Sequence, residues 1–567
     1  MKVSDYIVEF LIKEGVTDVF GYPGGMIAHL MNSFDKYKQQ ISVHTNYHEQ
    51  ASSFAANGYA QISGKVGVAY SSSGPGATNM LTGICNAYFD SIPTVFLTGQ
   101  VNVYEAKREL PIRQKGFQET EIIPIVESVT KYCAYVEKEE DIRYELEKAF
   151  YIAQEGRKGP VLLDIPMNVQ RMEILPEKLR SFYPEKKKED DVDVSLIIAK
   201  LKKAKRPVLL VGAATKDAQV RSLVNQLVRK WKIPVVSSML AVDVVPFDEG
   251  MNFGFLGAYG DRTANFIVAK SDLVIALGSR LDVRQVGGKR ENFAPKAQLI
   301  RVDIDAGELS HQVNNEEIHI CADVKIVLEK LYTENIDVAS LTEGWIDVCR
   351  QLQKELQGID DKVPNIAVRK IGKAIPRQYT ITTDVGQNQV WVAQSLETKI
   401  GQNILFSGGL GAMGYSLPAA IGAYYGSRKP VIAFTGDGGL QMNIQELQFI
   451  VREQLPIAII VLNNHALGMI RHFQEMYFEG NYTQTVDGHG YGTPDFGRIA
   501  QAYGIEYRLI DILKTTELEE FNVTKPVLLE VVFNENTYVF PKLEFGKPNQ
   551  DQEPLLDRDI FERLMRI

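Results

Sequence analysis

A strand, turn, helix and strand at residues 431–464 constrain the fold more strongly than any other part of the chain. Residues 431–435 (VIAFT) form an apolar run typical of a buried strand, and the Gly-Asp-Gly sequence that follows suits a tight turn. Residues 443–453 carry apolar side chains at helical spacing, and residues 457–462 (IAIIVL) form a second apolar run. This pattern predicts a βαβ unit, whose two strands run parallel and end at the same edge of one sheet.

Two side chains with oxygen donors come directly after these strands. Asp437 and Asn464 both fall just past a carboxyl end, where open α/β sheets place their ligands. Mg²⁺ prefers a few protein oxygens together with phosphate and water, and the backbone N–H groups of Gly438 and Gly439 can approach a diphosphate. A lone Gly-Asp-Gly more often marks an ordinary turn. The full arrangement indicates a magnesium and diphosphate site, and it resembles the signature of thiamine diphosphate (ThDP) enzymes.

Length and composition limit the number of domains, the kinds of partner and the location that we expect for this chain. A chain of 567 residues is too long for a single core and predicts about three domains. The net charge of −9 argues against a nucleic-acid partner. No apolar run is long enough to span a membrane, and the N-terminus predicts an amphipathic helix rather than a signal peptide, so we expect no membrane partner and a cytoplasmic location. Four scattered cysteines predict reduced, structural thiols.

Alternating strand and helix patterns predict an α/β fold with three doubly wound parallel-sheet domains. We expect the first domain at residues 1–170, a central domain at 190–335 and a third domain at 365–567. The polar, charged segment at 171–193 is expected to be a solvated linker. The central domain has strands that end in glycine, serine or aspartate, as nucleotide-binding sheets do, but no Gly-x-Gly-x-x-Gly follows any of them.

Glu49 is the second candidate for chemistry. It follows a predicted strand and precedes a helix of small residues (QASSFAA). By itself such a carboxylate more often caps a helix N-terminus. A thiamine site, however, needs a buried carboxylate against N1′ of the aminopyrimidine, so that the ring can take its imino form and its own nitrogen can accept the C2 proton. Glu49 therefore has two interpretations, a helix cap and a catalytic carboxylate.

Further motifs extend the likeness along nearly the whole chain. They are FGYPGG at 20–25, SGPGATN at 73–79, GFQET at 116–120, DVGQN at 384–388, GGLGAMG at 408–414 and NNHALGM at 463–469. With these motifs the chain resembles the large subunit of the acetohydroxyacid synthase (acetolactate synthase) family. The resemblance implies ThDP, Mg²⁺ and FAD as cofactors.

The resemblance also implies roles for the matching residues. Glu49 would be the carboxylate at the aminopyrimidine, and Phe117 and Gln118 would reach the site from a partner chain, which makes the enzyme at least a homodimer. The Mg²⁺ ligands would be Asp437, Asn464 and the carbonyl oxygen of Ala466. Other cofactor contacts would come from Gly25, Pro75, Asn79, Gly386, Gln387, Asn388, Gly411, Met413, Gly436, Gly438, Gly439, Leu467, Gly468 and Met469. Without the motif, Met413 is more simply a core methionine.

In this family the central domain carries FAD, usually without redox work. The residues that stand where the flavin is contacted are Arg157, Gly212, Gly257, Gly260, Arg280 and Asp303. Tyr259 replaces the histidine that is usual in the family. The alternative is a central domain that has lost its nucleotide.

The departures from the family pattern lie on the substrate side. Synthases for branched-chain amino acids typically have alanine, lysine, aspartate and tryptophan where this chain has Met26, Met167, Val283 and Phe473. Arg284, which matches an arginine that can grip a carboxylate, is kept. Met26, Arg284 and Phe473 are therefore the candidate substrate residues, and losing a lysine weakens the attraction for a second 2-keto acid.

The expected reaction is decarboxylation of pyruvate followed by transfer of the two-carbon unit to an acceptor carbonyl, as in acetolactate synthase. One alternative keeps this donor chemistry but uses a keto-sugar nucleotide or another ketone as acceptor. A second is a simple 2-keto acid decarboxylase or oxidase. A third is a regulatory or nucleotide-binding protein without activity, against which the presence of Glu49, Asp437 and Asn464 argues.

Overall fold

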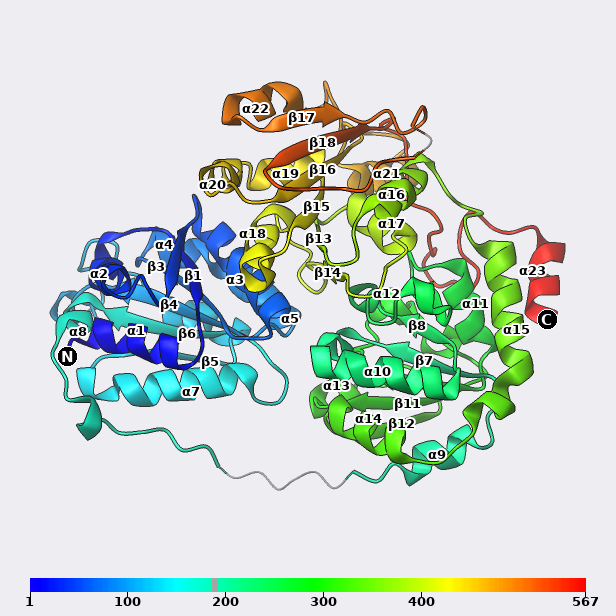
Figure 1. Ribbon diagram of the computed structural model, residues 1–567, viewed down its shortest axis with the longest axis horizontal. Coiled ribbons are helices and arrows are strands. Elements are labelled where there is room, and N and C mark those ends of the chain that lie inside the picture. Colours follow the sequence, from blue (N-terminus) through cyan, green and yellow to red (C-terminus); the bar gives the residue numbers. More distant parts are fainter. Residues whose placement is uncertain (186–191, 516) are drawn as a thin grey trace.

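The computed structural model describes residues 1–185, 192–515 and 517–567. These residues form three α/β domains, each built on a six-stranded sheet (Figure 1). All strand pairings within the sheets are parallel, and buried hydrophobic clusters lie on both faces of each sheet. The predicted fold class, three doubly wound parallel-sheet domains, is confirmed.

The first domain has the strand order β2-β1-β3-β4-β6-β5. Its strands are β1 (Asp18–Gly21), β2 (Ser42–Thr45), β3 (Gly67–Ser71), β4 (Thr94–Gln100), β5 (Tyr132–Tyr135) and β6 (Val161–Pro166). Its helices are α1 (Val3–Lys13), α2 (Ala28–Lys36), α3 (Glu49–Ser63), α4 (Pro75–Asn79), α5 (Leu81–Phe89), α6 (Ile122–Val126), α7 (Ile142–Gln154) and α8 (Met167–Arg171). The crossover helices between the strands allow every neighbour to run parallel.

The central domain has the strand order β12-β11-β10-β7-β8-β9. Its strands are β7 (Pro207–Val211), β8 (Val235–Ser237), β9 (Asn252–Phe255), β10 (Leu273–Leu277), β11 (Gln298–Asp303) and β12 (Glu317–Cys321). Its helices are α9 (Ser195–Leu201), α10 (Ala218–Trp231), α11 (Arg262–Lys270), α12 (Val283–Val286), α13 (Ala306–Ser310), α14 (Val324–Thr333) and α15 (Val338–Leu356). The predicted start of this domain at residue 190, and part of the predicted linker, lie outside the described residues.

The third domain has the strand order β14-β13-β15-β16-β18-β17. Its strands are β13 (Thr380–Thr383), β14 (Asn403–Leu405), β15 (Val431–Gly436), β16 (Ile457–Asn463), β17 (Glu506–Leu509) and β18 (Val527–Val532). Its helices are α16 (Val363–Ala374), α17 (Gln387–Ser395), α18 (Ser416–Ser427), α19 (Asp437–Met442), α20 (Glu446–Arg452), α21 (Gly468–Tyr477) and α22 (Phe496–Tyr503). The βαβ unit predicted from residues 431–464 is present as β15, two short helices and β16.

The end of the chain leaves the third domain and returns to the central one. Helix α23 (Arg558–Arg566) lies beside α15 and α11 (Figure 1), and Leu564 is fully buried there. The rings of Phe266 on α11 and Phe561 on α23 lie 5.5 Å apart. The last residues therefore complete the core of the central domain.

Helices α3 and α18 join the first domain to the third. Their backbones approach closely because glycines face them: a Cβ atom on Gly58 would lie 2.3 Å from the oxygen of Ala419, and one on Gly422 would lie 1.8 Å from the oxygen of Ala55. This contact forms within a single chain. That the first domain of one chain meets the third domain of another in an oligomer stays a prediction.

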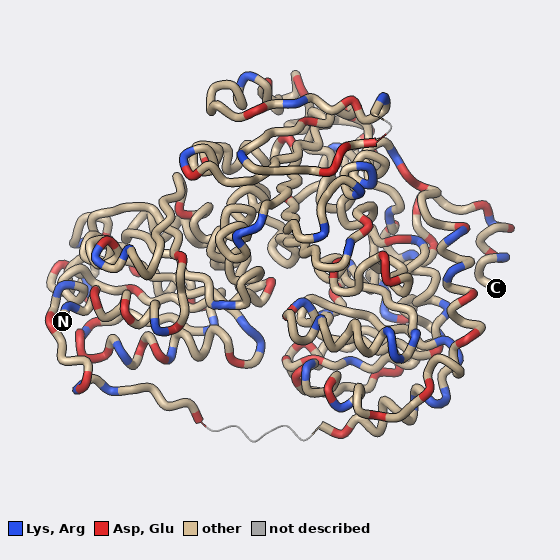
Figure 2. The backbone as a smooth tube through the Cα atoms, in the orientation of Figure 1, with Lys and Arg blue, Asp and Glu red and all other residues tan. Residues whose placement is uncertain are grey.

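Acidic and basic residues are intermixed over all three domains (Figure 2). This mixing limits the electrostatic field that any one domain projects, despite the net charge of −9. Among the described residues, no helix combines the length and the apolar character that a membrane span requires.

Candidate active site

Three neighbouring strands, β13, β15 and β16, end at one edge of the third sheet. Helix α17 begins at Gln387 shortly after β13, and α19 begins at Asp437 directly after β15. Asn464 follows β16, and the register pairs Gly436 with Leu462. The structure therefore brings Gln387, Asp437 and Asn464 together at the carboxyl edge of the sheet.

Asp437 and Asn464 form a buried set of oxygen donors. Asp437 is 3% exposed, and burial raises the pKa of its carboxyl to about 6, although the Tyr491 hydroxyl donates to Oδ2 at 3.1 Å. Asn464 is also buried, and its Nδ2 donates to Gln387 Oε1 at 3.1 Å. Ala466 is buried two residues further on. Carboxylate, amide and carbonyl oxygens at one edge fit the ligand preference of Mg²⁺.

The start of α17 presents unpaired polar atoms at this edge. Within the part of the chain that the structure describes, Gln387 Nε2 and Asn388 Oδ1 are buried without a hydrogen-bond partner. The preceding Gly386 has a φ of +132°, which lets the chain turn sharply into the helix. Because a buried amide donor without an acceptor is costly, Gln387 is suited to an anionic ligand at the helix N-terminus.

Glycines keep the start of α19 open. A Cβ atom on Gly438 would lie 2.9 Å from Leu467 Cδ2 and 3.2 Å from Met413 Cε. The predicted cofactor residues Leu467 and Met413 thus face Gly438, and any side chain in its place would fill the space between them. Gly468 allows a similar approach, because a Cβ atom there would lie 2.1 Å from Gln387 Oε1.

The loop that carries Gly411 and Met413 is held by Asp384. Its Oδ1 accepts a hydrogen bond from the Gly414 nitrogen at 2.8 Å, and burial raises the pKa of this carboxyl to about 6. Asn443 Nδ2 donates to the Gly414 oxygen, also at 2.8 Å. Both hydrogen bonds are made by Gly414, the residue after Met413, so they fix this end of its loop. Gly439 packs directly on Asp384, with its hypothetical Cβ atom 2.7 Å from Asp384 Cγ.

Glu49 is the first residue of α3, but it does not cap the helix. The cap is His48, whose Nδ1 accepts a hydrogen bond from the Gln50 nitrogen at 3.1 Å. Glu49 Oε2 instead accepts from Asn79 Nδ2 at 3.0 Å, and Oε1 lies 3.3 Å from where a Cβ atom on Gly76 would stand. The helix-cap interpretation of Glu49 is wrong, because His48 already fills that role.

Glu49 lies where the first domain meets the third. Its neighbour Gln50 accepts a hydrogen bond from Asn443 Nδ2 at 3.1 Å. Glu446, at the start of α20, accepts from Asn46 Nδ2 at 2.9 Å and from the Tyr47 nitrogen at 2.8 Å. Burial raises the pKa of the Glu446 carboxyl to about 7, and these donors oppose the shift. The edge that carries Asp437 is thereby linked to the segment that carries Glu49.

Phe117 and Gln118 lie on a loop of the same first domain. A Cβ atom on Gly74 would lie 3.0 Å from the Gln118 oxygen, so the loop packs beside Pro75 and α4. The Phe117 side chain is 78% exposed. That both residues reach the active site from a partner chain stays a prediction.

Gly25 and Met26 stand at the carboxyl edge of the first sheet. The Met26 nitrogen donates to Ser72 Oγ at 3.3 Å, and its oxygen accepts from Gln170 Nε2 at 2.8 Å. Met26 therefore borders the loop that leads to Pro75 and Asn79.

Comparison with known proteins agrees with this geometry. Residues 1–125, 194–331 and 384–531 match the N-terminal TPP binding domain, the central domain and the C-terminal TPP binding domain of thiamine pyrophosphate enzymes. The acetolactate synthase large subunit of Lactococcus lactis subsp. lactis (strain IL1403) is 35% identical over 558 residues, which cover 96% of this chain and 94% of that protein. The chain belongs to the acetolactate synthase family of thiamine pyrophosphate enzymes.

Two further relatives cover the chain to a similar extent. The large subunit of acetolactate synthase isozyme 2 from Escherichia coli (strain K12) is 33% identical over 563 residues, with 97% of this chain and 99% of that protein covered. A probable acetolactate synthase large subunit from Methanocaldococcus jannaschii is 36% identical over 564 residues, with 94% and 92% covered. The chain is therefore a ThDP-dependent enzyme, and the predicted family is confirmed.

In the protein described here, a large cavity lies between the domains. The cavity measures about 1080 Å³, slightly above the usual range for ligand sites. Arg157, Arg280 and Asp303 from the predicted flavin set line it. Arg157 donates to Asp305 Oδ2 at 2.8 Å and to Glu308 Oε1 at 2.7 Å, so this cation is already held in place.

The predicted flavin glycines bring backbone segments together beside the cavity. A Cβ atom on Gly212 would lie 2.1 Å from the Gly278 oxygen, and one on Gly260 would lie 2.5 Å from the Phe255 oxygen. Gly257 adopts a φ of +122°. These positions leave no room for a side chain, so they shape the cavity wall without lining it.

The three predicted substrate residues do not gather around one cavity. Arg284 is exposed and lines the large cavity together with Tyr259. Phe473 lies on α21, where its ring is tilted against that of Tyr477 with the centroids 4.7 Å apart, and its side chain remains half-exposed. Met26 lies in the first domain.

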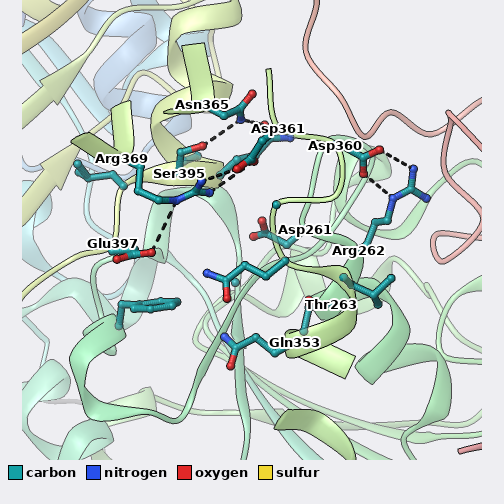
Figure 3. A pocket seen from close by; sticks show the side chains of 18 of the residues that line it. Asp261, Arg262, Thr263, Gln353, Asp360, Asp361, Asn365, Arg369, Ser395 and Glu397 are labelled. Carbon is teal, nitrogen blue, oxygen red and sulfur yellow. Dashed lines mark hydrogen bonds and ion pairs between the residues drawn. The ribbon is translucent and has the colours of Figure 1, made fainter. Parts of the chain in front are cut away.

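A second, small cavity of about 90 Å³ lies between the central and third domains (Figure 3). Its arginines already have carboxylate partners. Arg369 pairs with Asp361 and lies 3.7 Å from Glu397, and Arg262 binds Asp360 at 2.5 Å and 3.1 Å. With both cations neutralised, the cavity offers a ligand little free charge.

Several residues at the active site had no predicted role. Tyr491 touches Asp437 from a loop outside the regular elements, and Glu446 joins the two domains. Neither position shows a periodic or motif signal in the sequence. Asp384 stands within the DVGQN motif, and its role was detectable only as part of that motif.

Proposed function

We propose that this enzyme decarboxylates pyruvate and joins the remaining two-carbon unit to the keto carbon of a second pyruvate. Two pyruvate anions and a proton then balance one 2-acetolactate anion and one CO₂. The relatives are named as acetolactate synthases, which supports this assignment and favours it over the other acceptors and over a simple decarboxylase.

The observation that carries the proposal is the meeting of two half-sites across the contact of α3 with α18. Glu49 lies on one side, bound to Asn79. Asp437 and the unpaired Gln387 Nε2 lie on the other. Bound ThDP supplies the electron sink for loss of CO₂.

Each side of the site has a separate task. Asp437, Asn464 and the Ala466 carbonyl would hold Mg²⁺. Gln387 Nε2 and the backbone N–H groups of Gly438 and Gly439 would bind the diphosphate, and Gly436 would allow its close approach.

The remaining residues would orient the ring system. Met413 would support the bent shape of the cofactor from the loop that Asp384 anchors. Glu49 would hold and move a proton at N1′ of the aminopyrimidine, which requires a carboxylate facing that atom. Glu49 is free for this task because His48 caps α3.

We further propose FAD as the occupant of the large cavity. The volume of about 1080 Å³ supports a dinucleotide, and the predicted flavin residues Arg157, Arg280 and Asp303 line the cavity. Tyr259, in place of the histidine usual in the family, also lines this cavity.

We also propose a homo-oligomer of at least two chains. The faces of α3 and α18 that meet within this chain are complementary in shape, and the same faces can meet between two copies. The same residues form the active site in both arrangements. The arrangements differ only in whether the two half-sites come from one chain or from two.

Pyruvate turnover tests the reaction directly. With ThDP and Mg²⁺ present, we expect CO₂ release together with 2-acetolactate, identified by mass spectrometry. Acetaldehyde or acetate as the main product would show that the two-carbon unit is protonated or oxidised instead, and would contradict the proposal.

A further inference from the structure

The segment that follows α21 forms a loop that returns to the candidate metal site. We call residues 482–493 the tyrosine loop, after Tyr491. Tyr491 is partly buried, and its hydroxyl donates to Asp437 Oδ2 at 3.1 Å. A Cβ atom on Gly438 would lie 3.1 Å from the same hydroxyl. The phenol therefore stands against the start of α19, beside the carboxylate proposed to hold Mg²⁺.

The tyrosine loop is also bound to the segment after β16, which carries the other proposed metal ligands. The Leu467 nitrogen donates to the Thr485 oxygen at 2.9 Å. An antiparallel bridge pairs Ala466 with Val486. The loop is thus attached directly to the backbone that would supply the carbonyl oxygen of Ala466.

Further hydrogen bonds hold both ends of the loop. Near its end, Thr493 Oγ1 lies 2.7 Å from His465 Nδ1. Near its start, Thr485 Oγ1 donates to Gln474 Oε1 at 2.6 Å, and Gln474 Nε2 donates to the Thr483 oxygen at 2.9 Å. Gln474 lies on α21, so the loop is anchored to this helix and to the segment after β16 without any contribution from the phenol.

A tight turn inside the loop leads into Tyr491. The Gln484 nitrogen donates to the His489 oxygen at 2.7 Å, and the His489 nitrogen donates to the Val486 oxygen at 3.1 Å. Gly490, directly before Tyr491, has a φ of +93°, a conformation that favours glycine. The backbone that carries Tyr491 is therefore held in place independently of the hydrogen bond that its phenol makes.

A carboxylate ligand benefits from a fixed partner of this kind. The terminal torsion of an aspartate side chain is broad, so a carboxylate without a partner samples many orientations. Mg²⁺ demands near-ideal octahedral geometry, and a ligand oxygen that is free to rotate binds it less well. Groups that orient metal ligands by hydrogen bonds typically contribute about 10- to 100-fold to metal affinity.

We propose that Tyr491 is a positioning residue for the metal ligand Asp437. Its hydroxyl holds Oδ2, so that Oδ1 is turned toward Mg²⁺, and the tyrosine loop keeps the phenol in place. This inference rests on the proposed Mg²⁺ site. The tyrosine loop lies outside the motifs that carry the family resemblance, so the assignment comes from the contacts of this chain alone.

The test measures metal affinity apart from turnover. Tyr491→Phe removes the hydroxyl and keeps the ring. Enzyme freed of metal by a chelator is titrated with Mn²⁺ in the presence of ThDP, and free Mn²⁺ is followed by electron paramagnetic resonance. Mn²⁺ serves as the probe because it takes the same octahedral oxygen ligands as Mg²⁺. We expect the Kd for Mn²⁺ to rise about tenfold.

Turnover and ThDP binding give a second measurement on the same variant. The Mg²⁺ concentration for half-maximal pyruvate turnover should rise by the same factor as the Kd, and excess Mg²⁺ should restore turnover. At saturating Mg²⁺ the affinity for ThDP should stay within about twofold of wild type, because the groups that bind the diphosphate are unchanged. A damaged loop would lower metal affinity, ThDP affinity and maximal turnover together.

Tyr482→Phe is the matched control. It removes the same kind of hydroxyl from the same loop, but this hydroxyl donates to Glu475 on α21 at 3.0 Å, so the contact with Asp437 is kept. We expect its Kd for Mn²⁺ to match the wild type. If Tyr491→Phe is less stable, its thermal unfolding with and without Mn²⁺ decides, because weaker binding makes the metal raise the unfolding midpoint by less.

The outcomes separate the inference from the metal site on which it rests. An unchanged Kd for Mn²⁺ in Tyr491→Phe, an equal rise in Tyr482→Phe, or turnover that excess Mg²⁺ does not restore would overturn the inference. Asp437→Asn tests the site itself and should lose Mn²⁺ binding. If Asp437→Asn bound Mn²⁺ as tightly as the wild type, the proposed Mg²⁺ site would be wrong, whatever Tyr491→Phe shows.

Discussion

Replacing Gly422 by alanine should disrupt the contact between the first and third domains. A Cβ atom at this position would lie 1.8 Å from the oxygen of Ala55 and 2.8 Å from the nitrogen of Tyr59. Since ordinary contact begins near 3.4 Å, α3 and α18 would have to separate by about 1.6 Å. The opposing atoms belong to helix backbone, so they cannot rotate away as a flexible side chain would.

The separation acts on the active site because α3 begins at Glu49 and α18 follows the loop of Met413. Overpacking of this kind costs about 1–3 kcal/mol. A displacement of about 1 Å between catalytic groups lowers the rate on the order of a hundredfold. We therefore expect Gly422→Ala to weaken ThDP binding about five- to a hundredfold and to reduce kcat by a similar factor.

Fluorescence titration with ThDP, denaturant unfolding and pyruvate turnover measure these effects. Gly426→Ala is the control, because it lies one turn further along α18 and its Cβ atom would meet nothing closer than 3.1 Å. We expect it to cost much less. If Gly422→Ala kept the ThDP affinity and turnover of wild type, the close approach of α3 and α18 would not be what joins the two half-sites. Gel filtration of the same variant tells whether this contact also joins two copies.

Three further outcomes are expected. Glu49→Gln should abolish pyruvate turnover while ThDP still binds, as measured by CO₂ release and ThDP titration. Normal turnover in this variant would show that Glu49 does not hold the proton at N1′. Burial raises the pKa of Glu446 to about 7 from 4.5, so this carboxyl makes the wild type less stable as pH rises between these values. Glu446→Gln should therefore gain up to about 3 kcal/mol relative to wild type from pH 4.5 to 7 in denaturant unfolding, and a difference independent of pH would contradict the shift. The purified enzyme should show a flavin absorption band that Arg157→Met weakens, whereas a colourless protein that FAD does not reconstitute would refute the flavin proposal.

The sequence predicted β15 and β16 closely, but it missed one of the two helices between them. Apolar runs at 431–435 and 457–462 became β15 and β16. The expected helix at 443–453 is present as the shorter α20 (Glu446–Arg452), and a second helix, α19 (Asp437–Met442), stands where the sequence predicted only a turn. The Asn443 side chain binds Gln50 and the loop of Met413, and these tertiary contacts outweigh local helical periodicity.

The start of α3 shows the same limit of local sequence rules. Its position before a helix made a capping role plausible from local rules. The structure assigns the cap to His48, a residue with a weaker preference for that position. The Glu49 carboxylate instead accepts a hydrogen bond from Asn79. Local rules described the helix end correctly, but they did not identify which neighbouring side chain satisfies it.

By itself, the sequence determined the three-sheet architecture, the family and the sheet edge at which Asp437 and Asn464 lie. These follow from the alternation of apolar and polar residues and from short motifs, which are local and periodic. Only the tertiary structure decided the Tyr491 contact with Asp437 and the hydrogen bonds of Asn549 and Gln552 to loops of the central domain. Such contacts join residues far apart in the chain, and their hydrogen bonds depend on the relative placement of whole elements, so no local pattern encodes them.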